Sequence, residues 1–146
     1  MKFNLVLKIL LSFAVSIILL GFTYDLVNLD FNKQDKDKWN IPKDAAKLKN
    51  PTLRHKDAAL DGKKIFLQSC ISCHGINGLG NGPASVSMTN KPDNLTSDEV
   101  QKQPDGILFW KISNGHRTMI SWKFSLSERQ RWFLVDYLRV LGKKSK

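Results

Sequence analysis

Both cysteines of the chain lie in one short stretch, CISCHG, from Cys70 to Gly75, and a histidine follows the second cysteine directly. Two thiols at this spacing can form a redox disulfide, contribute to a zinc site or attach a haem. Zinc needs four ligands, and no second C-x-x-C or H-x-x-x-H cluster is present to complete the set. A redox pair would start a helix within a βαβ unit, whereas a glycine-rich loop follows here.

The pattern C-x-x-C-H is typical of covalent haem attachment. Cys70 and Cys73 are spaced to form thioether bonds with the two vinyl groups of one porphyrin. His74 would then lie beneath the iron and bind it through Nε2 as the proximal ligand. The sequence therefore predicts one covalently bound haem c.

An electron-transfer haem usually has a second axial ligand, and Met119 in GHRTMISW is our first choice. A thioether sulfur is a soft ligand that favours Fe(II) and raises the potential. Met88, in a polar loop, and His116, which would lower the potential, are the alternatives. An open sixth position would instead make the protein a gas binder. Met119 is otherwise an ordinary core methionine.

The region 57–142 has the pattern of helices separated by loops. We expect a helix from Asp57 to about Ser69, with Ala59, Gly62 and Phe66 along one face. The following HGINGLGNGP is too rich in glycine for a regular element.

Two further helices are expected. One covers GILFWKIS, introduced by Pro104 and stopped by Gly115. The other covers RWFLVDYLRV, begins with a capping box of Ser127 and Gln130, and is closed by Gly142. No segment alternates as a strand would, so we predict an all-α fold whose small core a covalent cofactor would complete.

Taken together, these motifs resemble the small monohaem class I cytochromes c of bacteria. The resemblance covers residues 57–142 and rests on these segments: GKKIF, CISCHG, GLGNGP, KPDNL, DGILFWKISNGHRTM and SERQRWFLVDYLRVL. It implies a haem domain of three to five helices that shuttles single electrons. It also implies that the first and last helices cross, with Gly62 and Phe66 facing Trp132 or Tyr137.

The resemblance also implies roles for residues around the haem. A proline in the loop after the haem motif accepts the second N–H of the ligating histidine, and Pro83 has the matching place. Met119 follows a glycine-bearing turn as the family's axial methionine does, although Ile120 replaces the usual proline. Other residues would pack against or border the haem, or else be plain turn and core residues: Gly82, Trp110, Trp122, Phe66 and the stretch KPDN.

The N-terminal residues 1–24 have the layout of an export signal. Lys2 and Lys8 precede an uncharged apolar run, ILLSFAVSIILLGFTY, that ends at Tyr24. As a helix, this run would rise about 24 Å, somewhat short of the roughly 30 Å hydrocarbon core of a bilayer. No A-x-A-like cleavage site stands out after Gly21. We favour an uncleaved membrane anchor, with a cleaved signal as the alternative.

Residues 25–56 are dominated by Asp, Asn and Lys, which predicts a polar linker, and residues 143–146 form a basic tail. Trp39–Pro42 and Asn50–Pro51 interrupt this composition, and there we expect the linker to lie against the domain. The formal net charge of the chain is +10. An exported chain rarely meets nucleic acid, so the surplus favours an acidic redox-partner protein or an anionic membrane surface. Solubility alone is the other interpretation.

We therefore expect an electron carrier of a respiratory chain, not itself an enzyme, on the periplasmic side of the cytoplasmic membrane. By analogy with the family that it resembles, its acidic partner would be an oxidase, a reductase or a dehydrogenase. Signal cleavage would make it a soluble periplasmic protein instead. Two other functions stay open: a cytochrome c subunit of a periplasmic dehydrogenase or reductase complex, and a gas-binding sensor with five-coordinate iron.

Overall fold

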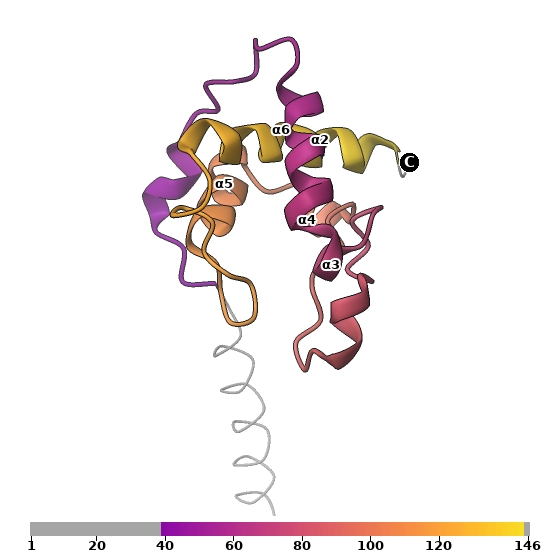
Figure 1. Ribbon diagram of the computed structural model, residues 1–146. Coiled ribbons are helices and arrows are strands. Elements are labelled where there is room, and N and C mark those ends of the chain that lie inside the picture. The colour runs from indigo at the N-terminus through magenta and orange to yellow at the C-terminus, as the bar shows by residue number, and fades with distance from the viewer. Residues whose placement is uncertain (1–38, 145–146) are drawn as a thin grey trace, which may run out of the picture. The chain divides into compact units, whose positions relative to one another are not determined.

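The computed structural model describes residues 39–144, and every regular element in this range is a helix, which confirms the predicted all-α fold (Figure 1). In chain order the elements are the 3₁₀ helix η1 (Lys43–Lys47), α2 (Ala58–Ser69), α3 (Ile71–His74), the 3₁₀ helix η2 (Pro83–Ser87), α4 (Asp98–Gln101), α5 (Asp105–Asn114) and α6 (Glu128–Lys144). The expected anchor, 1–24, lies outside the described residues. Among those that are described, no helix combines the length and apolar character needed to cross a bilayer.

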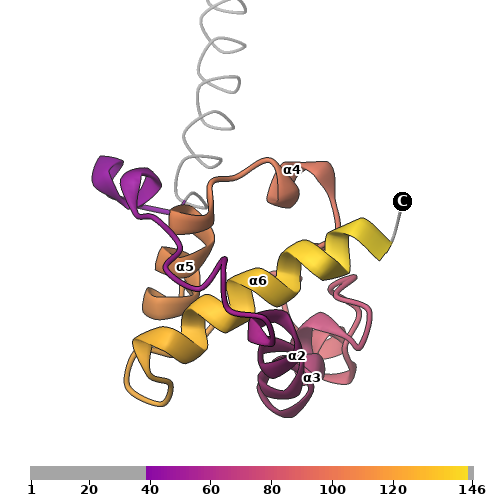
Figure 2. The same cartoon turned by 90° about the horizontal axis from the view of Figure 1, so that it is seen from above.

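Helix α2 begins and ends where the sequence predicts, after Asp57 and at Ser69. Asp57 stands at the N-cap position, but its side chain makes no capping hydrogen bond. The buried face carries Ala58, Gly62 and Phe66, so Ala58 takes the place expected for Ala59. This face packs against α6, which passes over α2 in Figure 2.

The crossing of α2 and α6 depends on Gly62. A Cβ atom at this position would lie 1.9 Å from the carbonyl oxygen of Phe133, so only glycine lets the two backbones approach this closely. One turn further on, the ring of Phe66 packs against that of Tyr137, with 5.3 Å between centroids. The predicted contact between first and last helices is therefore confirmed, and Tyr137 is the partner of Phe66.

Helix α5 also packs on α6. The ring of Phe109 stacks on Trp132, with centroids 4.0 Å apart and planes 9° from parallel. The hydrophobic core that joins α2, α4, α5 and α6 consists of these buried residues: Phe66, Val100, Leu108, Ile112, Trp132, Leu134, Val135, Tyr137, Leu138 and Leu141.

The predicted capping box starts α6. The Ser127 N–H donates to Gln130 Oε1 at 2.8 Å, and the Gln130 N–H donates to Ser127 Oγ at 3.3 Å. The predicted stop at Gly142 is wrong, because α6 continues to Lys144. Gly142 instead provides room for a neighbour: an added Cβ would lie 2.3 Å from the side chain of Gln101.

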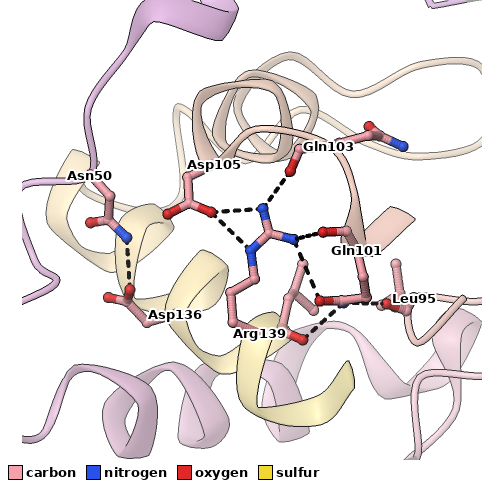
Figure 3. A network of polar contacts seen from close by, with 8 residues as sticks. Asn50, Leu95, Gln101, Gln103, Asp105, Asp136 and Arg139 are labelled. Atoms are coloured by element: carbon pink, nitrogen blue, oxygen red, sulfur yellow. Dashed lines mark hydrogen bonds and ion pairs between the residues drawn. The ribbon is translucent and has the colours of Figure 1, made fainter. Parts of the chain in front are cut away.

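The guanidinium group of Arg139 connects α6 to the end of α4 and the start of α5 (Figure 3). Arg139 donates to Asp105 Oδ1 from Nε at 2.8 Å and from Nη2 at 2.7 Å. It also donates to the backbone carbonyls of Gln101 and Gln103. Both members of the ion pair are only 24% exposed, so the pair is partly desolvated. No local sequence pattern predicts this contact.

The compact unit begins at Ile41, well before the expected end of the polar linker at residue 56. Residues 41–56, which we call the arm, pack onto the helices. Element η1 lies against α5, where a Cβ on Gly106 would come within 2.1 Å of the Ala45 carbonyl oxygen. The arm therefore belongs to the folded unit, because glycine at 106 leaves space for its backbone.

Further along, the arm is hydrogen-bonded to the middle of α6. Asn50 Nδ2 donates to Asp136 Oδ1 at 2.7 Å, and Thr52 Oγ1 donates to Asp136 Oδ2 at 2.6 Å (Figure 3 shows the first). The Thr52 N–H also donates to Asn50 Oδ1 at 2.8 Å, which closes the turn. Asp136 thus accepts from two residues more than eighty positions earlier in the chain.

Substituting Gly62 by Ala should destabilise the protein. In an open helix the change would gain about 1 kcal/mol. Here the new methyl group meets a backbone carbonyl that cannot rotate away, so we expect a net loss of about 1–3 kcal/mol. The urea midpoint of the full-length holoprotein measures this. Gly142→Ala is the matched control and should lose less, because its neighbour is a side chain; a Gly62→Ala protein as stable as the wild type would contradict the packing.

Candidate functional site

The helical turn of α3 brings together the three residues of the C-x-x-C-H motif. Cys70 is both the last cap of α2 and the N-cap of α3, and its carbonyl accepts from the N–H groups of Cys73 at 3.3 Å and His74 at 2.9 Å. Residues three and four apart share one face of a helix. Two thiols and an imidazole are therefore presented side by side.

Both thiols are free and half-buried. Burial raises the pKa of the Cys70 thiol to about 12, and the neighbouring Cys73 adds to this rise. Redox-active and zinc-binding cysteines need the opposite, a lowered pKa that stabilises the thiolate. In the part of the chain that the structure describes, no three His, Cys, Asp or Glu side chains are placed to hold a metal ion. This geometry favours neither a redox pair nor a zinc site.

The imidazole of His74 is half-buried, and burial lowers its pKa, an effect that the nearby Asp93 partly opposes. The neutral ring that results is the form that binds iron. Its Nδ1 is buried and has no hydrogen-bond partner. The expected bond from His74 to the Pro83 carbonyl is thus not formed; Pro83 is exposed and begins η2.

The glycine-rich loop after α3 folds back onto it. The N–H groups of Gly80 and Gly82 donate to the carbonyls of His74 and Cys73, at 2.8 and 3.0 Å. A Cβ on Gly82 would lie 2.4 Å from the carbonyl oxygens of Ile71 and Ser72, so glycine is required there by the α3 backbone. The loop thereby satisfies the C-terminal carbonyls of α3 and holds the motif in place.

Met119 is fixed in a tight turn after α5. Its N–H donates to the carbonyl of His116, and the His116 N–H donates back to the Met119 carbonyl, both at 2.9 Å. Arg117 takes a left-handed conformation with φ of 55°, and Gly115 leaves room for the Met119 carbonyl, which would lie 2.4 Å from an added Cβ. Met119 is half-buried against the core, and His116 is half-buried in the same turn.

The other predicted haem neighbours differ in their surroundings. Trp122, like Cys70 and Met119, packs against the core and keeps part of its surface exposed. Trp110 on α5 and Met88 after η2 are also half-buried. Phe66 is only 1% exposed, because it lies in the crossing of α2 and α6.

The two segments that carry the donor atoms required by a haem c lie on one side of α6. In Figure 1, α3 and the segment between α5 and α6 lie on the same side of α6. The first contributes two free thiols and a neutral imidazole, and the second contributes a thioether sulfur. Partly exposed apolar side chains accompany both sets. This donor chemistry fits a covalently attached haem.

Sequence reasoning missed Lys111, which lies near this site on α5. Burial lowers its pKa, and the carboxylate of Asp93 opposes the shift. Asp93 also opposes the lowering of the His74 pKa, first through its backbone and then through its charge. A lysine inside the otherwise apolar run FWKIS was the available signal.

Fold and site together define a c-type cytochrome domain. Residues 57–138 match the family described as "Cytochrome C oxidase, cbb3-type, subunit III". This match covers more than half of the chain, and the chain belongs to that family. The resemblance to class I cytochromes c is thereby confirmed, and single-electron transfer through covalently bound haem is the function that this family supports.

None of the curated proteins compared is significantly similar to the chain. Among solved structures, a chain of the reducing HAO-like protein complex of Kuenenia stuttgartiensis superposes with a TM-score of 0.53 at 24% identity. The match covers 73% of this chain and 52% of the other, so the present chain spans about half of that protein. At this identity the likeness shows the fold alone.

Replacing Cys70 and Cys73 together by Ala should abolish covalent haem attachment, because both thioether-forming atoms are removed. Haem staining after denaturing electrophoresis, on protein from a host that matures c-type cytochromes, measures this. Ser72→Ala, an exposed change between the two thiols, is the control and should stain normally. A stained band from the double variant would refute the attachment.

Proposed function

We propose that the chain holds one haem c and carries single electrons between membrane-bound respiratory complexes, as an exported protein tethered by its N-terminal segment. The observation that carries this proposal is the placement of two free thiols and an imidazole on one face of α3, with Met119 held in a separate turn. Family membership of residues 57–138 supports it.

Four residues would hold the cofactor. Cys70 and Cys73 would form the thioether bonds, His74 would bind the iron through Nε2, and Met119 would bind it through Sδ. The bound haem supplies an iron that gains and loses one electron with no covalent bond made or broken. Met88 and His116 remain the alternatives for the sixth position.

The surrounding chain would keep His74 and Met119 in place during electron transfer. His74 is fixed by α3 and by the loop amides that bind the α3 carbonyls, and Met119 is fixed by its two hydrogen bonds to His116. Apolar groups such as Trp122 and Leu126 pack against the core in the same segment and would limit the access of water to the haem. Rigid ligands and few reorienting waters mean little rearrangement when the charge changes by one unit.

Chemistry and sequence support a location outside the cytoplasm. Thioether attachment of haem takes place outside the cytoplasm, where an export segment delivers the chain. The apolar run from Ile9 to Tyr24 supports both export and an anchor on the periplasmic side of the membrane.

A terminal oxidase is the electron acceptor that we favour, because the family takes its description from a cytochrome c oxidase subunit. The same description names a subunit, which supports the second candidate, a permanent cytochrome subunit of an oxidoreductase. The two differ in lifetime: a carrier dissociates from its partner at high salt, whereas a subunit co-purifies with it.

Raising the ionic strength should slow electron exchange with the partner by about tenfold or more if the basic surface steers an acidic one. The chain carries 23 Lys and Arg against 13 Asp and Glu, so the association is between opposite charges. Stopped-flow mixing at several salt concentrations measures the rate. A flat salt profile would exclude electrostatic steering.

Met119→Ala should lower the reduction potential and allow the reduced protein to bind CO, because a soft sulfur ligand is lost and a coordination position opens. Redox titration and the near-infrared sulfur-to-iron band measure both effects. Met88→Ala is the matched control and should retain the wild-type potential and band. The reverse pattern would assign the sixth position to Met88.

A further inference from the structure

The segment that carries Met119 also exposes two large apolar side chains. Ile120 is 61% exposed and Phe124 is 84% exposed, the largest value among the exposed large hydrophobic residues that the structure describes. Single exposed apolar residues are normal on protein surfaces. Two within five residues, beside the predicted axial ligand, are a local concentration of apolar surface.

Exposure of Phe124 does not come from a loosely held loop. The N–H groups of Trp122 and Lys123 donate to the carbonyls of Ile112 and Ser113 at the end of α5, both at 3.2 Å. Beyond Phe124, the Leu126 N–H donates to the Trp122 carbonyl at 2.9 Å. Trp122 and Leu126 pack inward against the core. Phe124 is thus held outward by a backbone fixed on both sides.

Positive charge accompanies these apolar groups. Arg117 and Lys123 are exposed, and the segment from Gly115 to Ser127 contains no Asp or Glu. The Lys123 ammonium lies 4.9 Å from the centre of the Phe124 ring. Aromatic side chains and Arg are enriched at protein interfaces, and rim charges such as that of Lys123 speed association with an oppositely charged partner.

We propose that residues 115–127, the Met119 loop, form the surface that docks the redox partner, with Phe124 entering an apolar depression on a partner whose rim carries carboxylates. This inference rests on the proposed function. A partner held at Ile120 would contact the residue next to the predicted iron ligand, which gives electrons a short route. A second copy of the chain fits less well, because a symmetric contact would bring Arg117 and Lys123 against their own copies.

Since Phe124 is pre-positioned, removing its ring should weaken docking without altering the haem. The test uses full-length holoprotein with Phe124→Ala and membrane fragments from a host strain that lacks the gene. Oxidation of the reduced protein is followed over a range of its concentrations. We expect KM to rise about tenfold with kcat unchanged, the effect of truncating an interface hot spot. Phe124→Trp should restore most of the affinity.

Leu53→Ala is the control for loss of exposed apolar surface. Leu53 is 70% exposed and lies in the arm, so its loss should leave KM unchanged. Neutralising Arg117 and Lys123 with Gln should flatten the salt dependence of the rate, whereas the same change at Lys56 and Lys63 should not. An unaltered KM in Phe124→Ala, or an altered KM in Leu53→Ala, would overturn the inference.

Electron exchange with hexacyanoferrate separates this inference from the proposed function. A wild-type protein that fails to exchange with this small anion would refute the proposed function itself. If exchange is normal in both wild type and Phe124→Ala, a raised KM with the membranes supports the docking role. A changed absorption spectrum in Phe124→Ala would instead assign Phe124 to the haem pocket. A changed oligomeric state would assign the loop to a second copy of the chain, and changed binding to anionic lipid vesicles would assign it to a membrane. Each of these results would overturn the inference.

Discussion

The close backbone contact between α2 and α6 at Gly62 determines where the chemistry of this protein is placed. Helix α3 starts at Cys70, the residue that ends α2, so no linker separates the helix crossing from the haem-binding motif. The orientation of α2 against α6 therefore sets the position of both thiols and of the imidazole. A change in that crossing would displace all three groups together.

The second half of the site depends on α5. The Met119 loop is hydrogen-bonded to the carbonyls of Ile112 and Ser113 at the end of α5. Helix α5 is in turn held to α6 by two contacts, the stack of Phe109 on Trp132 and the ion pair of Arg139 with Asp105. The positions of both sets of donor atoms therefore depend on α6. For an electron carrier, whose ligands should move little between oxidation states, a common support of this kind limits the rearrangement.

Local signals in the sequence were sufficient for much of this arrangement. The capping box at Ser127 and the glycine stop after α5 each act within a few residues, and α6 begins and α5 ends where these signals predict. The signals failed where the partner is distant. Gly142 resembles a helix stop, yet it accommodates Gln101, and the arm looked like a linker because Asp136, its acceptor, lies far along the chain. Whether His74 would meet Pro83 depends on loop geometry that no motif specifies.

Asp136 also helps to determine how mechanical load enters the domain. A pull along the chain from the N-terminal side meets the contact of η1 with α5 first, and then the bonds from Asn50 and Thr52 to this carboxylate in the middle of α6. Helix α2 follows Thr52 in the chain and so comes after both contacts. Such a load is therefore shared by α5 and α6 before it reaches the haem-binding turn at the end of α2.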